Sequence, residues 1–184
     1  ETTHKISIEG SRHKKEVTAT SHICLPSKDA VKRRLPVGEK DALNVWNFIQ
    51  TNANKAVRYR DMALYQLMEQ TGGRVQELHL VTVDDFKEAR RMTEPSLKMY
   101  TLKRKDEQTT RHVPIPHTLV TDLAQYMKYR RKIMKTKGLT GDKDHGFLFI
   151  ATKTGEPFKA DSWTTYMNKW KKELGIKGEF HPHL

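Results

Sequence analysis

The sequence has little cysteine, no long apolar stretch and no cluster of carboxylates, and each absence excludes a class of protein. Cys24 is the only cysteine, so no internal disulfide can form and a reducing compartment is expected. No apolar run approaches the roughly 20 residues that span a bilayer, and the N-terminus shows no signal-peptide pattern. No cluster of cysteines or carboxylates has the spacing of a metal site. We therefore expect a soluble intracellular protein without a metal or cofactor.

Basic side chains are abundant instead. The 184 residues include 34 Lys and Arg against 22 Asp and Glu, which gives a formal net charge of +12 and an isoelectric point of about 9.8. Such an excess favours a polyanionic partner, with nucleic acid first and an anionic membrane surface second. The basic residues are spread over every segment rather than gathered on one amphipathic helix, which weakens the membrane interpretation. DNA or RNA is the expected partner.

The apolar pattern predicts a mainly α-helical α+β fold with a small antiparallel β-sheet. Helical spacing predicts helices around Trp46, over Arg60–Gln70, just after Arg74, from a cap at Thr118 to about Met134, and from a cap at Asp161 to Leu174. Two-residue alternation predicts strands at Leu97–Lys103 and Arg111–Ile115, joined by a polar turn as a hairpin, and a short apolar strand at Phe147–Ile150. Aromatic residues at helical spacing after Asp161 are expected in the core.

Two segments leave alternatives open. Residues 1–34 are polar, and they fit either a short hairpin or a charged arm or linker. The second half of the long helix is strongly basic, and this stripe is either DNA-facing or a solvated complement to the helix dipole, with the second interpretation slightly favoured. The stripe consists of Arg130, Arg131, Lys132, Lys135 and Lys137.

The most informative segment is TGGRVQEL, Thr71 to Leu78. An apolar helix runs into Gly72 and Gly73, which can adopt the positive φ that ends a helix. Arg74 then lies where a new helix begins, close to backbone N–H groups that favour an anion. Its planar guanidinium can form two parallel charge-assisted bonds to a phosphate. Taken alone, the segment fits an ordinary connection between helices with a surface arginine better than an anion site.

Taken together, several motifs resemble the catalytic domain of tyrosine recombinases, the phage-integrase family of site-specific recombinases. The resemblance is carried by the segments TGGRVQELHLVTVDDF (71–86), LKMYTLKRKDEQTTRHVPIP (97–116), GFLFI (146–150) and FHPHL (180–184). It implies a catalytic domain over residues 35–184 whose C-terminal part is missing, with residues 1–34 as an N-terminal arm or linker. It also implies that the domain wraps around duplex DNA and that the intact parent assembles as a tetramer on paired sites.

The resemblance assigns catalytic roles to four residues. Arg74 matches the family's first catalytic arginine, which holds oxygens of the scissile phosphate. Lys105, or Lys103 if the register is shifted, is the general acid that protonates the leaving oxygen. His183 matches the histidine of the His-x-x-Arg box and would donate to the phosphate. Glu77 matches an acidic position that orients a basic neighbour.

The remaining members of the family's catalytic set would lie beyond Leu184. They are the second arginine, a later histidine or tryptophan, and the nucleophilic tyrosine, and no tyrosine follows His183 in this sequence. We therefore expect a fragment that binds DNA without cutting it, from a cytoplasmic, nucleoid-associated integrase of a phage or mobile element. The parent would form a 3′-phosphotyrosine link. A non-catalytic DNA-binding module is the alternative, and a hydrolytic nuclease is disfavoured because no carboxylate cluster is evident.

Overall fold

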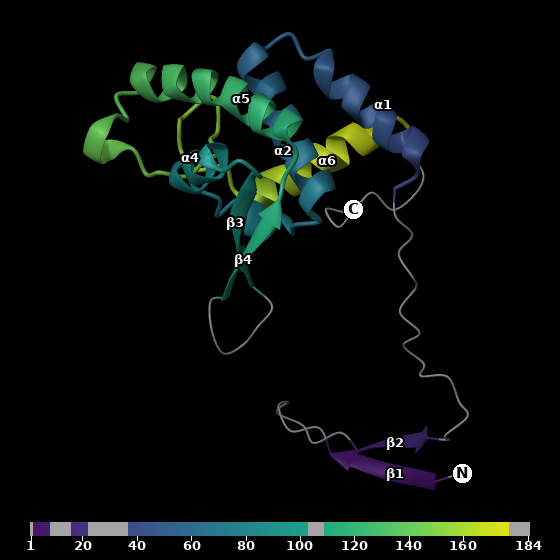
Figure 1. The fold of residues 1–184 in the computed structure, drawn as a ribbon. Helices are drawn as coiled ribbons and strands as arrows, with labels where there is room; N and C mark the ends of the chain where they lie inside the picture. The colour runs from purple at the N-terminus through teal and green to yellow at the C-terminus, as the bar shows by residue number, and fades with distance from the viewer. Residues whose placement is uncertain (1, 8–15, 22–36, 103–108, 177–184) are drawn as a thin grey trace. The chain divides into compact units, whose positions relative to one another are not determined.

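The computed structural model describes residues 2–7, 16–21, 37–102 and 109–176 (Figure 1). The chain divides into two units, residues 1–34 and residues 35–184. In the first unit, β1 (Thr2–Ser7) and β2 (Glu16–Ser21) pair antiparallel, with Thr2 opposite Ser21 and Ser7 opposite Glu16. The weak alternation in this stretch therefore corresponds to paired strands.

The described part of the second unit contains six helices and one two-stranded antiparallel sheet. The helices are α1 (Glu39–Gln50), α2 (Lys55–Thr71), α3 (Val75–Leu78), α4 (Val83–Arg91), α5 (His117–Thr136) and α6 (Ala160–Glu173), with a 3-10 turn at Gly141–Lys143. The strands β3 (Ser96–Thr101) and β4 (Thr109–Pro114) pair with Ser96 opposite Pro114 and Thr101 opposite Thr109. The fold class predicted from the sequence is confirmed.

One apolar core joins these helices to the hairpin. From α6, Trp163, Met167 and Trp170 are all buried, as their helical spacing predicts, and the two indole rings meet edge to face at 5.1 Å between centroids. From α5, Tyr126 stacks on Phe149 with 5.5 Å between ring centroids. Such aromatic pairs add roughly 0.5–1.5 kcal/mol beyond the burial of their area.

Several predicted boundaries differ from the observed ones because local hydrogen bonds decide them. Helix α2 begins at Lys55, earlier than predicted, because the Asn54 side chain accepts hydrogen bonds from the amides of Ala56 (3.0 Å) and Val57 (3.2 Å). Helix α5 follows Pro116, so that Thr118 lies inside the helix and is not its cap. Helix α6 is preceded by Lys159, so Asp161 lies in the first turn.

The segment Phe147–Ile150 is not a strand. It forms only isolated bridges, with Phe147 opposite Thr82 and Ile150 opposite Pro157. Its polar backbone is satisfied by other partners, for example by the Tyr126 hydroxyl, which accepts a hydrogen bond from the Ile150 amide at 3.0 Å. The apolar run is therefore an irregular core segment, which an apolar pattern alone does not distinguish from a buried strand.

The basic stripe of α5 is not uniform. Arg130 is 1% exposed, and its guanidinium donates to both oxygens of Asp144 at 2.9 and 2.6 Å and to the Phe147 carbonyl at 2.9 Å. Neither interpretation of the stripe is therefore right for this residue. The other four residues, Arg131, Lys132, Lys135 and Lys137, are exposed. In the part of the chain that the structure describes, no helix has the length and apolarity needed to cross a membrane.

Candidate functional site

The turn between α2 and α3 is shaped by two glycines that serve different purposes. Gly72 has φ 58° and its amide donates to the Met68 carbonyl at 3.0 Å, so it ends α2 in the left-handed conformation that glycine favours. Gly73 does not have a positive φ, contrary to the prediction. A Cβ there would overlap the terminal methyl group of Met99 on β3. The absence of a side chain at Gly73 therefore leaves room for Met99 of the β3–β4 hairpin to pack against the turn.

Arg74 follows this turn and is fixed by Glu77. Its Nη1 donates to Glu77 Oε1 at 2.9 Å, and its backbone amide donates to Glu77 Oε2 at 3.3 Å. The sequence had led us to expect an amide that is free to bind an anion at this point. The Arg74 amide is instead occupied by Glu77. The contact agrees with the expectation that Glu77 orients a basic neighbour.

A second arginine reaches the same carboxylate from the hairpin. Arg111, on β4, lies 3.3 Å from Glu77 Oε2 through its Nη2. The Glu77 side chain is 1% exposed, whereas those of Arg74 and Arg111 are 35% and 44% exposed. We call these three residues the Glu77 cluster. It buries one negative charge and presents two positive charges to solvent, so its formal charge is positive.

The Glu77 cluster keeps hydrogen-bond donors available for a ligand. Among the described residues, Arg74 uses only Nη1 of its guanidinium and Arg111 uses only Nη2. Each guanidinium carries five N–H donors in a planar fork, and a buried carboxylate on one side directs the remaining donors outward. Two oriented guanidiniums of this kind suit a dianionic or diester oxyanion, above all a phosphate.

Three of the predicted site residues lie outside the described residues. Lys103 and Lys105 fall in residues 103–108, between the ends of β3 and β4, and His183 falls in residues 177–184. Arg74 itself is placed beside the hairpin by the Gly73–Met99 contact. The roles of Arg74, Lys103, Lys105 and His183 in catalysis stay predictions.

Five of the six tyrosines form ring contacts or hydrogen bonds within the described residues. Tyr65 donates to the Ala42 carbonyl at 3.2 Å, and burial raises the pKa of Tyr65 and of Tyr126 to about 12, which disfavours their ionised, nucleophilic form. Tyr59 and Tyr129 stack at 5.0 Å between centroids. Tyr166 lies under the Arg60 guanidinium, and Tyr100 lies on β3 opposite Thr110.

Arg111 is the site residue that sequence reasoning missed. Its partner Glu77 is 34 positions away, so no local spacing reveals the contact. A weaker signal was present in the alternation of β4. Arg111 lies opposite Met99, and Val113 lies opposite the buried Leu97, so this charged residue is on the apolar face of the hairpin and requires a partner there.

Comparison with known proteins gives one family and a set of similar folds. Residues 18–184 match the model of the phage integrase family. No curated protein matches the sequence. The XerA recombinase structure has a TM-score of 0.58 at 18% identity, over 81% of this chain and 46% of that one.

Two further structures are similar in fold. The Tn1549 transposon integrase in complex with transposon right end DNA has a TM-score of 0.56 at 16% identity, over 85% of this chain and 52% of that one. The lambda integrase catalytic core has a TM-score of 0.50 at 15% identity, over 82% and 77%. This chain therefore spans about half the length of the first two structures.

Proposed function

Because the chain belongs to the phage integrase family, we propose that it forms part of the catalytic domain of a tyrosine-type recombinase that cleaves and rejoins duplex DNA at specific sites. The observation that carries the proposal is the Glu77 cluster, in which a buried carboxylate holds two solvent-facing guanidiniums beside a β-hairpin. The strongly basic composition supports DNA as the substrate. The Tn1549 integrase, which has a similar fold, is described in complex with DNA.

The proposed chemistry is a phosphoryl transfer without nucleotide hydrolysis. A tyrosine oxygen attacks the scissile phosphorus, the bond from phosphorus to the 5′ oxygen breaks, and a 3′-phosphotyrosine link forms. Negative charge collects on the non-bridging oxygens during this step, and fixed cations stabilise it most. The donors of Arg74 that Glu77 does not use can hold two of these oxygens.

The leaving 5′ oxygen requires a proton. A lysine between β3 and β4 can supply it, with Lys105 as the first choice and Lys103 as the second. His183 would donate a further hydrogen bond to the phosphate. We propose that the main role of Arg111 is to position Glu77, which in turn positions Arg74. In this scheme no metal ion or cofactor takes part.

The nucleophile and the partners complete the proposal. The packing of five of the six tyrosines favours a nucleophile other than these five. We propose that the intact recombinase works as a tetramer on paired DNA sites in the nucleoid of its host. Residues 1–34 would serve as an arm or linker to another DNA-binding part, and residues 35–184 would be the catalytic unit.

The first test is a substitution of Arg74 in the intact recombinase that contains this chain. Arg74→Ala should abolish strand cleavage and leave duplex affinity within a few-fold, because binding is shared among many cations. Arg131→Ala removes an exposed arginine from α5 and is the matched control, with cleavage expected unchanged. Equal loss of binding and cleavage for Arg74→Ala would favour the non-catalytic DNA-binding module instead.

The second test identifies the general acid and the nucleophile. Lys105→Ala should slow cleavage of ordinary DNA but not of DNA whose leaving 5′ oxygen is replaced by sulfur, because sulfur leaves without a proton. Absence of rescue would move the role to Lys103, which is tested in the same way. Mass spectrometry of the trapped covalent complex should locate the phosphotyrosine outside this chain, and a phosphotyrosine at Tyr100 or at a packed tyrosine would contradict the proposal.

A further inference from the structure

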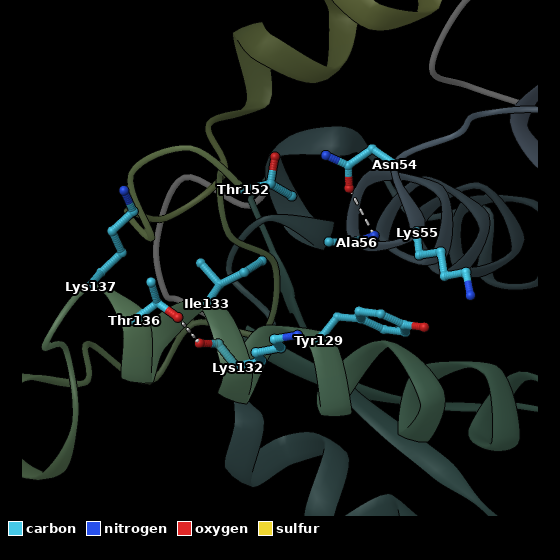
Figure 2. Close-up of a pocket in the computed structure, with 9 residues that line it drawn as sticks. All are labelled: Asn54, Lys55, Ala56, Tyr129, Lys132, Ile133, Thr136, Lys137 and Thr152. Atoms are coloured by element: carbon cyan, nitrogen blue, oxygen red, sulfur yellow. Dashed lines mark hydrogen bonds between the residues drawn. The ribbon is translucent and has the colours of Figure 1, made fainter.

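A second basic feature lies at the far end of α2 from the Glu77 cluster. Helix α2 runs from Lys55 to Thr71, just before Arg74, and a helix of this length extends roughly 25 Å. A cavity of about 430 Å³ lies where the start of α2 meets the C-terminal half of α5 (Figure 2). We call it the lysine cavity. Its volume is within the range of roughly 300–1,000 Å³ that is usual for ligand sites.

Three lysines surround the lysine cavity. Figure 2 shows Lys55 from α2 and Lys137 from the end of α5 on opposite sides, with Lys132 between them beside the ring of Tyr129. The residues that line the cavity include no carboxylate. Within the described ranges, none of the three ammonium groups forms an ion pair. The lining of the cavity therefore carries three positive side chains and no negative one.

The helix dipoles explain only part of this arrangement. Lys132 and Lys137 lie near the C-terminal end of α5, where a cation is favourable. Lys55 is the first residue of α2, and the first turn of that helix has no acidic residue. A cation at a helix N-terminus is unfavourable by a few tenths of a kcal/mol to about 1 kcal/mol. An anion in the lysine cavity would offset this unfavourable placement of Lys55.

The neutral groups around the cavity are also suited to an oxyanion. Asn54 Oδ1 accepts from the first amides of α2, which leaves its Nδ2 on the side toward Thr152 (Figure 2). The Tyr129 side chain that lines the cavity is held in place, because its ring stacks on Tyr59 of α2 at 5.0 Å between ring centroids. The cavity thus combines ammonium groups with the side-chain amide of Asn54 and the hydroxyl of Thr152, beside two packed helices.

We propose that the lysine cavity is a non-catalytic binding site for phosphate groups. These groups belong either to the backbone of a DNA segment held by the recombinase or to a free oligophosphate. The DNA source rests on the proposed function, whereas the oligophosphate source does not. In the first case the domain holds phosphates at both ends of α2, with only the end at Arg74 involved in chemistry.

Protection of lysines from acetylation tests the site in the unaltered chain. Duplex DNA or inorganic triphosphate should lower the acetylation rates of Lys55, Lys132 and Lys137 several-fold, measured by mass spectrometry. Lys128 and Lys135, exposed on the same helix but not lining the cavity, are the internal controls. Protection of the cavity lysines by triphosphate alone assigns a free phosphate ligand, and protection by duplex assigns DNA. Equal protection of all five lysines, or of none, would overturn the proposal.

A charge-matched pair of triple variants provides the second measurement. The affinity for duplex DNA falls as salt rises, and the variant Lys55→Gln, Lys132→Gln, Lys137→Gln should make this fall less steep. The slope of log affinity against log salt should become less negative by about 0.9 for each lost phosphate contact. The control Lys128→Gln, Arg131→Gln, Lys135→Gln removes the same charge from α5 outside the cavity. Equal slopes for both variants, together with unchanged triphosphate binding, would exclude the site. The two proposals can fail separately. An unchanged cleavage rate in Arg74→Ala would contradict the proposed recombinase function, and protection of the cavity lysines by triphosphate would still support the phosphate site.

Discussion

The Glu77 cluster and the Arg130–Asp144 pair use the same chemical groups in opposite arrangements. In the Glu77 cluster the carboxylate is buried and the two guanidiniums are about a third or more exposed. In the Arg130–Asp144 pair the guanidinium side chain is 2% exposed and the carboxylate is 32% exposed. The first arrangement directs unused N–H donors outward, whereas the second uses the donors of its arginine inside the protein.

The difference separates arginines that are open to solvent from a structural one. Arg130 lies on α5 and donates hydrogen bonds to Asp144 and to the Phe147 carbonyl. It therefore holds the irregular segment before Leu148 against α5. A third pair, Arg60–Asp61, is buried on both sides, and this burial raises the pKa of Asp61 to about 6 even though Arg60 opposes the shift. Only in the Glu77 cluster, among these three sites, are arginines accessible to a ligand.

The largest expected effect comes from breaking the structural arginine. Arg130→Ala leaves the Phe147 carbonyl without its partner and opens a cavity, so we expect the free energy of unfolding to fall by about 3 kcal/mol. For a chain of this size the thermal midpoint should then fall by roughly 6–12 °C. Thermal denaturation followed by circular dichroism measures this. A midpoint within 1–2 °C of the parent would show that the pair is not structural.

A smaller effect is expected at the buried carboxylate of the Glu77 cluster. Glu77→Gln removes the charge that separates Arg74 from Arg111, and we expect a loss of about 1–2 kcal/mol because solvent screens both guanidiniums. In the intact recombinase the same variant should slow cleavage and leave duplex affinity nearly unchanged. Glu88→Gln, on the exposed face of α4, is the matched control. A variant as stable and as active as the parent would mean that Glu77 positions nothing.

Acid should lower the stability that the Arg130–Asp144 pair contributes, by an amount similar to or smaller than the loss expected for Glu77→Gln. Hydrogen bonds from Arg130 lower the pKa of Asp144 to about 2, below its ordinary value near 4. The Asp144 carboxylate therefore contributes stability that is complete above about pH 4 and is lost as the pH falls through about 2. Because this side chain is a third exposed, the contribution is about 1 kcal/mol. The pH dependence of urea unfolding should be flatter in Asp144→Asn, and identical profiles would contradict the assignment.

The smallest effect on stability is expected at Arg74. Arg74→Ala should change the free energy of unfolding by less than about 0.5 kcal/mol, because the side chain is partly exposed and Arg111 still pairs with Glu77. Urea denaturation beside Arg130→Ala gives the contrast directly. A loss as large as that of Arg130→Ala would show that Arg74 is structural, and the comparison between the two sites would fail.

The sequence predicted the fold class and five of the six described helices of the second unit, because both depend on local periodicity and on glycine chemistry, but it did not predict α4 (Val83–Arg91). It also identified the turn that holds Arg74, since Gly72 ends α2 as the pattern indicated. It did not reveal Arg111, whose partner is distant in the chain. Arg130 was assigned to a surface stripe, although it continues the apolar spacing of Leu123, Met127 and Met134 on α5. A charged residue at a core position of a helix indicates a buried pair, and this signal was available.

The contact between Gly73 and Met99 has a consequence for how such a site could diverge. The terminal methyl group of Met99 occupies the space where a Cβ of residue 73 would lie, next to side-chain atoms of Leu78 and Thr71. The size of residue 99 therefore affects how closely the strands pack against the turn before Arg74. Exchange of this single uncharged side chain would give related sequences a way to adjust the position of that turn while every charged residue stays the same.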